Sequence, residues 1–206
     1  MNSATVNIDS KNQVNDLNRG PETGYMEVVN SDSTNQLIAD CKNGVNSAYE
    51  KIYSLYSKAM FNISLRITNN REESEDVLQE SFLSAFKNIQ QFEGRASFGS
   101  WLKRIVVNKS IDAVKKRKVK FISFEDEQRD LVLEEETDES EMEYSVEAVN
   151  QAVQLLPDGF RTVITLYLFE DYSHKDIGEL LGISENTSKT QYLRAKKKLI
   201  TLLNKK

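Results

Sequence analysis

The sequence predicts an all-α protein with two small helical domains joined by a flexible acidic linker. Apolar residues recur at helical spacing in several stretches, whereas the β-branched alternation typical of strands is scarce. No proline stands between Pro21 and Pro157 to interrupt a helix. Residues 125–143 carry eleven acids against one base, Arg129, and such a composition cannot bury enough apolar surface to fold. We therefore expect a tail (1–30), a first domain (31–122), the linker (123–145) and a second domain (146–206).

The N-terminal 30 residues are rich in Asn, Ser, Asp and Gly and lack apolar periodicity, which predicts a disordered tail. They contain no charged region followed by an apolar core, so a secretory signal is not expected. The most apolar run, 163–169, is much shorter than the ~20 residues that cross a membrane. We expect a soluble, cytoplasmic protein without membrane insertion.

Three helices are expected in the first domain. Residues 48–67 place aromatic and aliphatic side chains on one continuous stripe, namely Tyr49, Ile52, Tyr53, Tyr56, Met60, Ile63 and Ile67. A second helix covers 71–89, with acids in its first turns and Leu78, Phe82, Phe86 and Ile89 on its buried side. A third begins after Ser97 and soon becomes strongly basic.

That third helix has the composition of a nucleic-acid-binding element. Between residues 95 and 120 there are nine bases against one acid, and Phe98 and Trp101 stand at the start of the helix. Aromatic rings that stack on unpaired bases, beside cations that follow phosphates, are typical of single-strand binding. Aromatic residues in a core beside solubilising lysines would give the same pattern, and for Phe98 alone we favour the core.

Residues 173–198 have the pattern of a helix-turn-helix. Ser173 and Asp176 form a capping box, and Gly182 can end the first helix in a left-handed conformation. Ser184 can cap a second helix, which would enter a DNA major groove. From 184 to 206 there are seven bases and one acid, Glu185. A helical hairpin with a solvated basic face would show the same spacing, but this concentration of charge favours DNA.

The net charge of -5 conceals a basic protein. Without residues 125–143 the chain holds 26 bases and 21 acids, a net charge of +5. The acidic segment is interpreted as an interdomain linker. A second hypothesis is that it imitates DNA and competes for the basic faces.

No catalysis, cofactor, metal or small-molecule substrate is predicted. One cysteine, Cys41, excludes an intrachain disulfide, and one histidine, His174, is expected to be polar surface at a helix start. The glycines do not cluster and no P-loop is present. An enzyme that acts on nucleic acid would need acidic residues at metal-binding spacing outside the linker, and none stand out.

Two blocks of the sequence resemble the sigma-70 family. The first consists of DVLQESF from Asp76, FGSWLKRIVVN from Phe98, Asp112 and the basic KKRK at 115–118, and it resembles region 2. The second extends from Leu156 to YLRA at 192–195 and resembles region 4. Their order and spacing fit the short, two-domain branch called extracytoplasmic-function sigma factors.

The resemblance implies an initiation factor that binds core RNA polymerase through the β′ coiled coil and the β subunit, recognises -10 and -35 promoter elements, and promotes DNA melting. An anti-sigma factor is a common companion in the family. The residues that match the polymerase-docking positions are Asp76, Gln79 and Glu80. Those that match the -10 positions are Arg95, Ser97, Ser100, Trp101, Arg104, Asn108, Lys109, Asp112, Lys115, Lys116 and Arg117. Those that match the -35 positions are Asn186, Thr187, Lys189, Thr190, Gln191, Arg194, Lys197 and Lys198.

Two assignments have alternatives. Asn108 and Asp112 lie one turn apart and could brace their own helix instead of facing DNA. In the -35 segment, Ser188 and Gln191 depart from the Gly-Thr-Val-Lys-Ser-Arg of many family members, which puts the inferred base preference in doubt because Gln prefers adenine edges and Arg prefers guanine. For the whole chain, the alternative is a helix-turn-helix regulator that binds duplex DNA independently of polymerase, but the single-strand region around Trp101 would then have no purpose.

Overall fold

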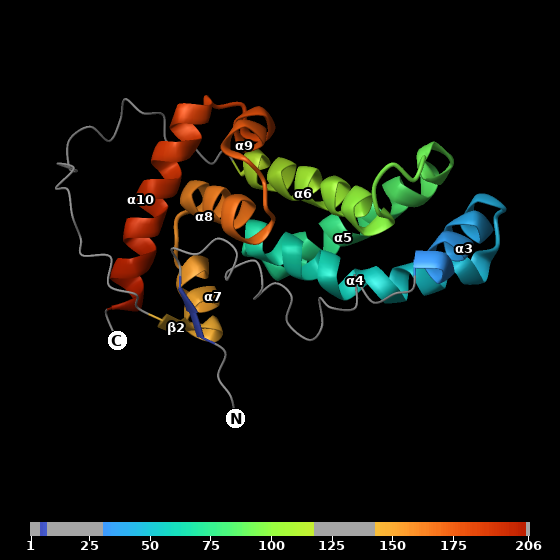
Figure 1. The fold of residues 1–206 in the computed structure, drawn as a ribbon, viewed down its shortest axis with the longest axis horizontal. Coiled ribbons are helices and arrows are strands. Elements are labelled where there is room, and N and C mark those ends of the chain that lie inside the picture. The colour runs from blue at the N-terminus through green and yellow to red at the C-terminus, as the bar shows by residue number, and fades with distance from the viewer. Residues whose placement is uncertain (1–4, 8–30, 118–142, 205–206) are drawn as a thin grey trace. The chain divides into compact units, whose positions relative to one another are not determined.

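The computed structural model describes residues 5–7, 31–117 and 143–204 (Figure 1). The chain divides into two compact units, which we call the N-terminal unit (31–116) and the C-terminal unit (5–7, 117 and 143–204). Each unit consists mainly of helices, so the predicted all-α fold with two domains is confirmed. Most of the tail expected at 1–30 and of the linker expected at 123–145 lies outside the described residues.

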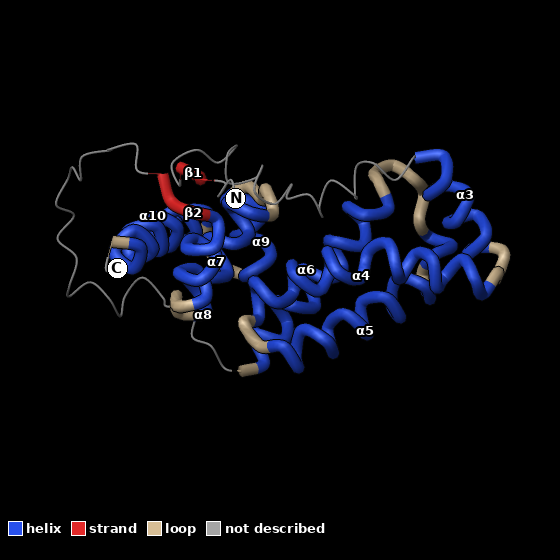
Figure 2. Tube along the Cα trace, turned by 90° about the horizontal axis from the view of Figure 1, so that it is seen from below, coloured by secondary structure: helices blue, strands red, loops and turns tan. Residues whose placement is uncertain are grey.

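Four helices and one 3₁₀ turn form the N-terminal unit. They are α3 (Ser31–Lys42), α4 (Asn46–Thr68), α5 (Arg71–Lys87), η1 (Ile89–Gln91) and α6 (Phe98–Lys116). The last three long helices pack against one another (Figure 2), and α3 packs on α4. Their apolar stripes meet in a core in which Met60, Leu102 and Val106 are fully buried. The three predicted helices therefore form, whereas α3 was not predicted.

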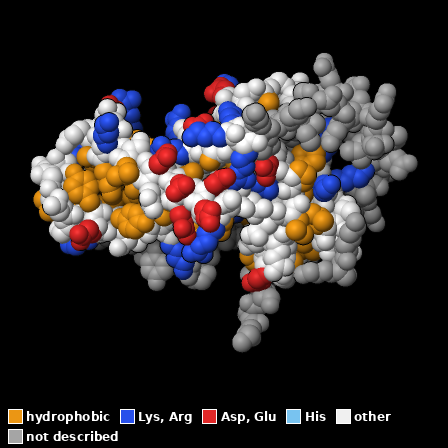
Figure 3. Space-filling view, turned by 180° about the vertical axis from the view of Figure 1, so that it is seen from behind, with side chains coloured by type: hydrophobic (Ala, Val, Ile, Leu, Met, Phe, Trp, Pro, Cys, Tyr) orange, Lys and Arg blue, Asp and Glu red, His pale blue; other side chains and the backbone are white. Residues whose placement is uncertain are grey.

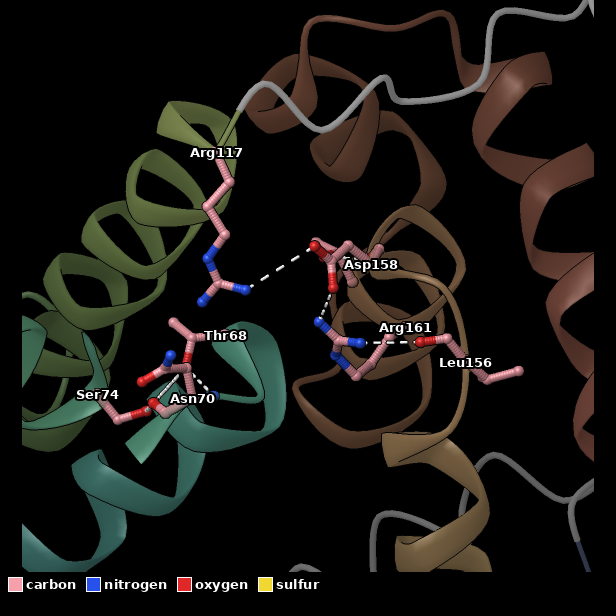
Figure 4. Close-up of polar contacts among 8 residues, drawn as sticks. Thr68, Asn70, Ser74, Arg117, Leu156, Asp158 and Arg161 are labelled. Atoms are coloured by element: carbon pink, nitrogen blue, oxygen red, sulfur yellow. Dashed lines mark hydrogen bonds and ion pairs between the residues drawn. The ribbon is translucent and has the colours of Figure 1, made fainter. Parts of the chain in front are cut away.

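The junction between α4 and α5 follows from two asparagines. Asn69 ends α4 in the left-handed conformation (φ 52°), which its short polar side chain tolerates better than most. Asn70 caps α5, because its side-chain oxygen accepts a hydrogen bond of 3.1 Å from the Glu73 amide. Beneath this junction the hydroxyl groups of Thr68 and Ser74 share a hydrogen bond of 2.7 Å (Figure 4).

The C-terminal unit is built around its last helix. Its elements are β1 (Thr5–Asn7), β2 (Glu143–Ser145), α7 (Val146–Gln154), α8 (Asp158–Ile164), the π-helical turn η2 (Thr165–Phe169), α9 (His174–Leu181) and α10 (Glu185–Leu203). Helix α10 packs against α7, α8 and α9. Buried side chains from α7, α8, η2 and α10, among them Val153, Ile164 and Leu199, form one hydrophobic cluster.

Arg161 is a buried charge in this unit. Its residue is 2% exposed, and its guanidinium group donates a hydrogen bond of 2.8 Å to the carbonyl oxygen of Leu156 and pairs with the Asp158 carboxylate (Figure 4). The charge thus has both an anionic partner and a carbonyl acceptor, which a buried guanidinium requires. The arrangement fixes the start of α8 against the end of α7.

The short ladder between β1 and β2 corrects two expectations. Thr5–Asn7 belong to the segment expected to be a disordered tail, and Glu143–Ser145 to the end of the expected linker, yet they pair antiparallel with Val6 opposite Tyr144. The pairing uses backbone groups of segments far apart in the sequence, which composition does not report. Ser145 also caps α7 by accepting a hydrogen bond of 3.2 Å from the Ala148 amide.

Candidate nucleic-acid interface

The loop before α6 is fixed by the helix cap. Ser97 accepts a hydrogen bond of 3.2 Å from the Ser100 amide, and the two hydroxyl groups lie 2.8 Å apart. Both side chains are exposed, as is Arg95, which forms an ion pair of 2.6 Å with Glu93. Ser97 and Ser100 therefore define where the helix begins, a structural role that the -10 assignment did not include.

Trp101 lies at the edge of an aromatic cluster. Its ring centroid is 5.4 Å from that of Phe92 and 5.5 Å from that of Phe98. Phe98 is 3% exposed, so the expectation that it belongs to the core is confirmed. Trp101 is half-buried, so part of the indole is held by the core and part stays accessible.

An exposed polar face continues along α6 from Trp101. Arg104 and Asn108 follow it at i+3 and i+7, which is the same side of a helix, and both are exposed. Asp112 is exposed one turn later, so Asn108 and Asp112 are not core residues. Lys115 and Lys116, at the basic end of the helix, are exposed as well, whereas Arg117 follows the helix and its guanidinium group lies 3.8 Å from the Asp158 carboxylate. The structure thus brings most of the predicted -10 residues to one side of α6.

Lys109 is oriented differently, toward α5. Its ammonium group lies 3.1 Å from the Glu80 carboxylate, and its side chain is 30% exposed against 64% for Glu80. The ion pair joins a residue predicted to face DNA to one predicted to face polymerase.

Helix α5 presents the predicted docking residues on one exposed face. Asp76, Gln79 and Glu80 are all exposed, while Val77 and Leu78 are buried beneath them. Leu83 continues this face at i+3 and i+4 and is 69% exposed. Leu83 was not among the predicted docking residues, although its spacing from Gln79 and Glu80 places it on the same face. Other hydrophobic side chains are visible on the surface of the N-terminal unit, at the left of Figure 3.

The helix-turn-helix forms as its local signals predict. The reciprocal capping box of Ser173 and Asp176 is present, Gly182 ends α9 in the left-handed conformation (φ 73°), and the Ser184 side chain accepts from the Thr187 amide at 3.0 Å. Gly178 makes the tight turn possible, because a β-carbon there would lie 2.8 Å from the backbone oxygen of Ile183. The close packing of α9 against the start of α10 therefore depends on a missing side chain.

Gln191 was predicted to contact the -35 element, but the structure buries it inside the C-terminal unit. Its side chain faces inward with Ser188 and Ala195, and the residue is 5% exposed. The family resemblance implied a -35 contact for Gln191, but the position of the residue on the helix relative to Ala195 and Leu199 turns its side chain inward. Direct reading of a base by Gln191 is therefore not retained.

His174 was expected to be polar surface, but it is half-buried and contacts neighbouring side chains. Its ring stacks on Tyr167 with centroids 4.3 Å apart, and its Nδ1 lies 3.0 Å from the hydroxyl oxygen of buried Ser188. Tyr192 completes this group, 4.5 Å from Tyr167, and burial raises the pKa of its hydroxyl group to about 12. Together these side chains hold α9 and η2 against α10.

The outward face of α10 carries most of the remaining -35 residues. Asn186, Lys189, Lys197 and Lys198 are exposed, and Thr187, Thr190 and Arg194 are half-buried. Lys189 forms an ion pair of 2.7 Å with Glu185, which lowers the pKa of that carboxyl group mainly through the hydrogen bond between them. Leu193 lies among these polar residues and is 60% exposed.

Comparison with known proteins decides the family. Residues 52–119 match the family model for Sigma-70 region 2, and residues 147–199 match that for Sigma-70, region 4. The ECF RNA polymerase sigma factor SigW of Bacillus subtilis is 32% identical over 174 residues, which cover 79% of this chain and 92% of that protein. The chain belongs to the extracytoplasmic-function branch of the sigma-70 family. The region 2 match includes α5 and α6, so a helix-turn-helix regulator that acts without polymerase is not supported.

Further relatives of this sigma factor are more distant. The RNA polymerase sigma-H factor of Pseudomonas aeruginosa is 24% identical, with 82% of this chain and 93% of that protein covered. Among solved structures, the sigma factor RpoE in complex with the anti-sigma factor NepR from Bartonella quintana is 19% identical, with 76% of this chain and 97% of that chain covered and a TM-score of 0.49.

Within the ranges 31–117 and 143–204, no helix is long and apolar enough to cross a membrane. In the same ranges, His, Cys, Asp and Glu side chains form no group of three or more that could hold a metal ion.

Proposed function

We propose that this sigma factor directs core RNA polymerase to promoters and opens the DNA through three surfaces, one each on α5, α6 and α10. It supplies binding and strand capture and performs no catalysis of its own. The chemistry of each surface supports a different contact.

The face of α5 suits a protein partner. Asp76, Gln79 and Glu80 put two carboxylates and an amide on one exposed side of a rigid helix, and Leu83 adds exposed apolar area beside them. Complementary charge fixes the register of a partner, and burial of an apolar group adds affinity. We assign this face to the polymerase β′ coiled coil, in line with the family resemblance.

The start and exposed side of α6 suit an opened DNA strand. A base that leaves the duplex loses a few kcal/mol of stacking and pairing, which contact with an aromatic ring offsets in part. Trp101 offers such a ring, held in place by Phe92 and Phe98, and Arg104 and Asn108 supply a cation and an amide beside it. We assign this surface, with Arg95, Ser97, Ser100 and the basic helix end, to the -10 element.

The outward face of α10 suits the major groove of the -35 element. Asn186 and Lys189 lie in the first half of the helix, where base edges are reached, and Lys197 and Lys198 lie in the second half, where cations meet phosphates. Gln191 is buried on the other side of this helix and is not part of the assigned surface.

The single observation that carries the proposal is the half-exposed Trp101 beside Arg104 and Asn108. A protein that bound only duplex DNA would gain nothing from this site, whereas an initiation factor needs it to trap the melted strand.

Run-off transcription with core polymerase of the same organism tests the proposal. The full chain should support initiation from a promoter bearing its own -10 and -35 elements. Asp76→Lys combined with Glu80→Lys should abolish core binding, because both carboxylates of the α5 face are reversed. Glu50→Lys combined with Glu179→Lys changes the net charge equally at exposed positions outside the three surfaces and should leave core binding unchanged. Full core affinity in the α5 variant would contradict the docking assignment.

A further inference from the structure

Leu193 is an exposed apolar side chain between two lysines on α10. It is 60% exposed on α10, with Lys189 and Lys197 one turn before and one turn after it. A single exposed leucine is common on protein surfaces, so its position between two lysines on the side of α10 opposite the buried side, and not its exposure alone, is what points to a ligand. Burial against a ligand would remove that apolar area from water.

The position of Leu193 on the helix is well defined. Seven residues, or about two turns, separate it from Asn186, so both lie on the same side of α10. The opposite side holds buried Ser188, Ala195 and Leu199, packed into the C-terminal unit. The side that carries Leu193 is therefore the one that a major groove would meet.

The chemistry of the groove identifies the ligand group. Base edges in the major groove present hydrogen-bond donors and acceptors, and the apolar group among them is the C5-methyl of thymine. A leucine side chain cannot form a hydrogen bond or an ion pair, so it gains no affinity from a phosphate or from a donor or acceptor atom on a base edge. We propose that Leu193 reads a thymine methyl group in the -35 element, an inference that rests on the assignment of α10 to that element.

The same geometry limits where the thymine lies. With a rise of ~1.5 Å per residue, Leu193 lies about 10 Å along the helix from Asn186. That length corresponds to about three base-pair steps of ~3.4 Å. The thymine should therefore fall within about three base pairs of the base that Asn186 contacts, for which adenine is the favoured partner of an Asn side chain.

The inference can be tested by removing only the thymine methyl group from the DNA. Holoenzyme assembled from core polymerase and the full chain would first select duplexes from a pool randomised across the -35 region. Each thymine of the selected sequence would then be replaced singly by deoxyuridine, which keeps every hydrogen-bonding group and lacks only the methyl. For the unaltered chain, one such replacement should weaken binding about fourfold, the effect of one methyl-sized apolar contact.

Protein variants show whether the effect of deoxyuridine on binding depends on the Leu193 side chain. Leu193→Ala should weaken binding to the thymine duplex and abolish the difference between thymine and deoxyuridine. Leu155→Ala is the matched control, since Leu155 is 69% exposed, follows α7 and lies off α10. It should leave both the affinity and the deoxyuridine effect unchanged. Lys197→Ala should weaken binding to all duplexes and reduce the salt dependence, while the deoxyuridine effect remains.

Two results would overturn the inference: no deoxyuridine replacement weakens binding by the unaltered chain, or the effect persists undiminished in Leu193→Ala. In the second case another side chain reads the methyl group, and Leu193 would face a protein instead. A holoenzyme that enriches no -35 sequence at all is a distinct outcome, because it contradicts the assignment of α10 itself.

Discussion

Substitution of Gly178 by alanine should destabilise the C-terminal unit, although alanine is the better helix former. The added β-carbon would lie 2.8 Å from the Ile183 oxygen and 3.4 Å from the Glu185 nitrogen, and both are backbone atoms that cannot rotate away. The Gly178 carbonyl also accepts from the amides of Gly182 and Ile183, at 2.9 and 3.0 Å, so the turn is closed over this residue. The turn must therefore shift to admit the methyl group.

The magnitude follows from two opposed effects. Overpacking of this kind costs about 1–3 kcal/mol, whereas replacement of glycine within a helix returns up to ~1 kcal/mol. The net loss is about 0–2 kcal/mol, and the middle of that range, about 1 kcal/mol, should lower the midpoint of thermal unfolding by about 4–8 °C for a unit of this size. Glu179→Ala, at the next and exposed position of α9, lacks the steric conflict and should leave the midpoint nearly unchanged.

The two units can be followed separately in one sample. The chain has one tryptophan, Trp101, and it lies in the N-terminal unit, so its fluorescence reports that unit. Circular dichroism of the helices reports both. Gly178→Ala should shift the circular dichroism transition and leave the fluorescence transition in place. An unchanged or higher midpoint in circular dichroism would refute the steric argument, because helix propensity would then be the only effect.

Two further outcomes are expected from the C-terminal unit. Arg161→Met should lower its stability by about 1–3 kcal/mol in the same unfolding assay, because the Leu156 carbonyl loses its buried donor and Asp158 loses the nearer of its cationic partners and keeps Arg117 at 3.8 Å; equal stability would mean that packing of the methionine compensates fully. Tyr192 has a pKa of about 12 in the folded chain against 10 for an ordinary tyrosine, so its contribution is complete below pH ~10 and is lost as pH rises toward 12, by at most about 2–3 kcal/mol. Tyr192→Phe should remove that part of the alkaline loss, measured by circular dichroism against pH, and an identical pH profile would contradict it.

The parts of the fold that could be predicted are those with local signals. The capping box at Ser173, the left-handed Gly182 and the cap at Ser184 act over three or four residues, so each can be recognised from neighbouring letters alone. Helices α4 and α6 carry clear apolar stripes. Helix α8 and η2 were missed because nearly every residue from 159 to 169 is buried, which removes the periodic signal. The pairing of Val6 with Tyr144 depends on long-range contact, which no local pattern contains.

The candidate interfaces, too, could be predicted only where local sequence patterns indicate them, and α10 is an exception. The family resemblance implied that Gln191 faces DNA, yet Gln191 and Ser188 are buried while Leu193 is exposed. Ser188 can be buried because His174 lies within hydrogen-bond distance of its hydroxyl group. Leu193, by contrast, is an apolar side chain that is 60% exposed on the opposite side of the helix. On our proposal, the exposed leucine and not the number of lysines indicates the DNA-facing side of α10. On α5, Leu83 is likewise 69% exposed beside Gln79 and Glu80, in line with the proposal that this face meets a protein partner.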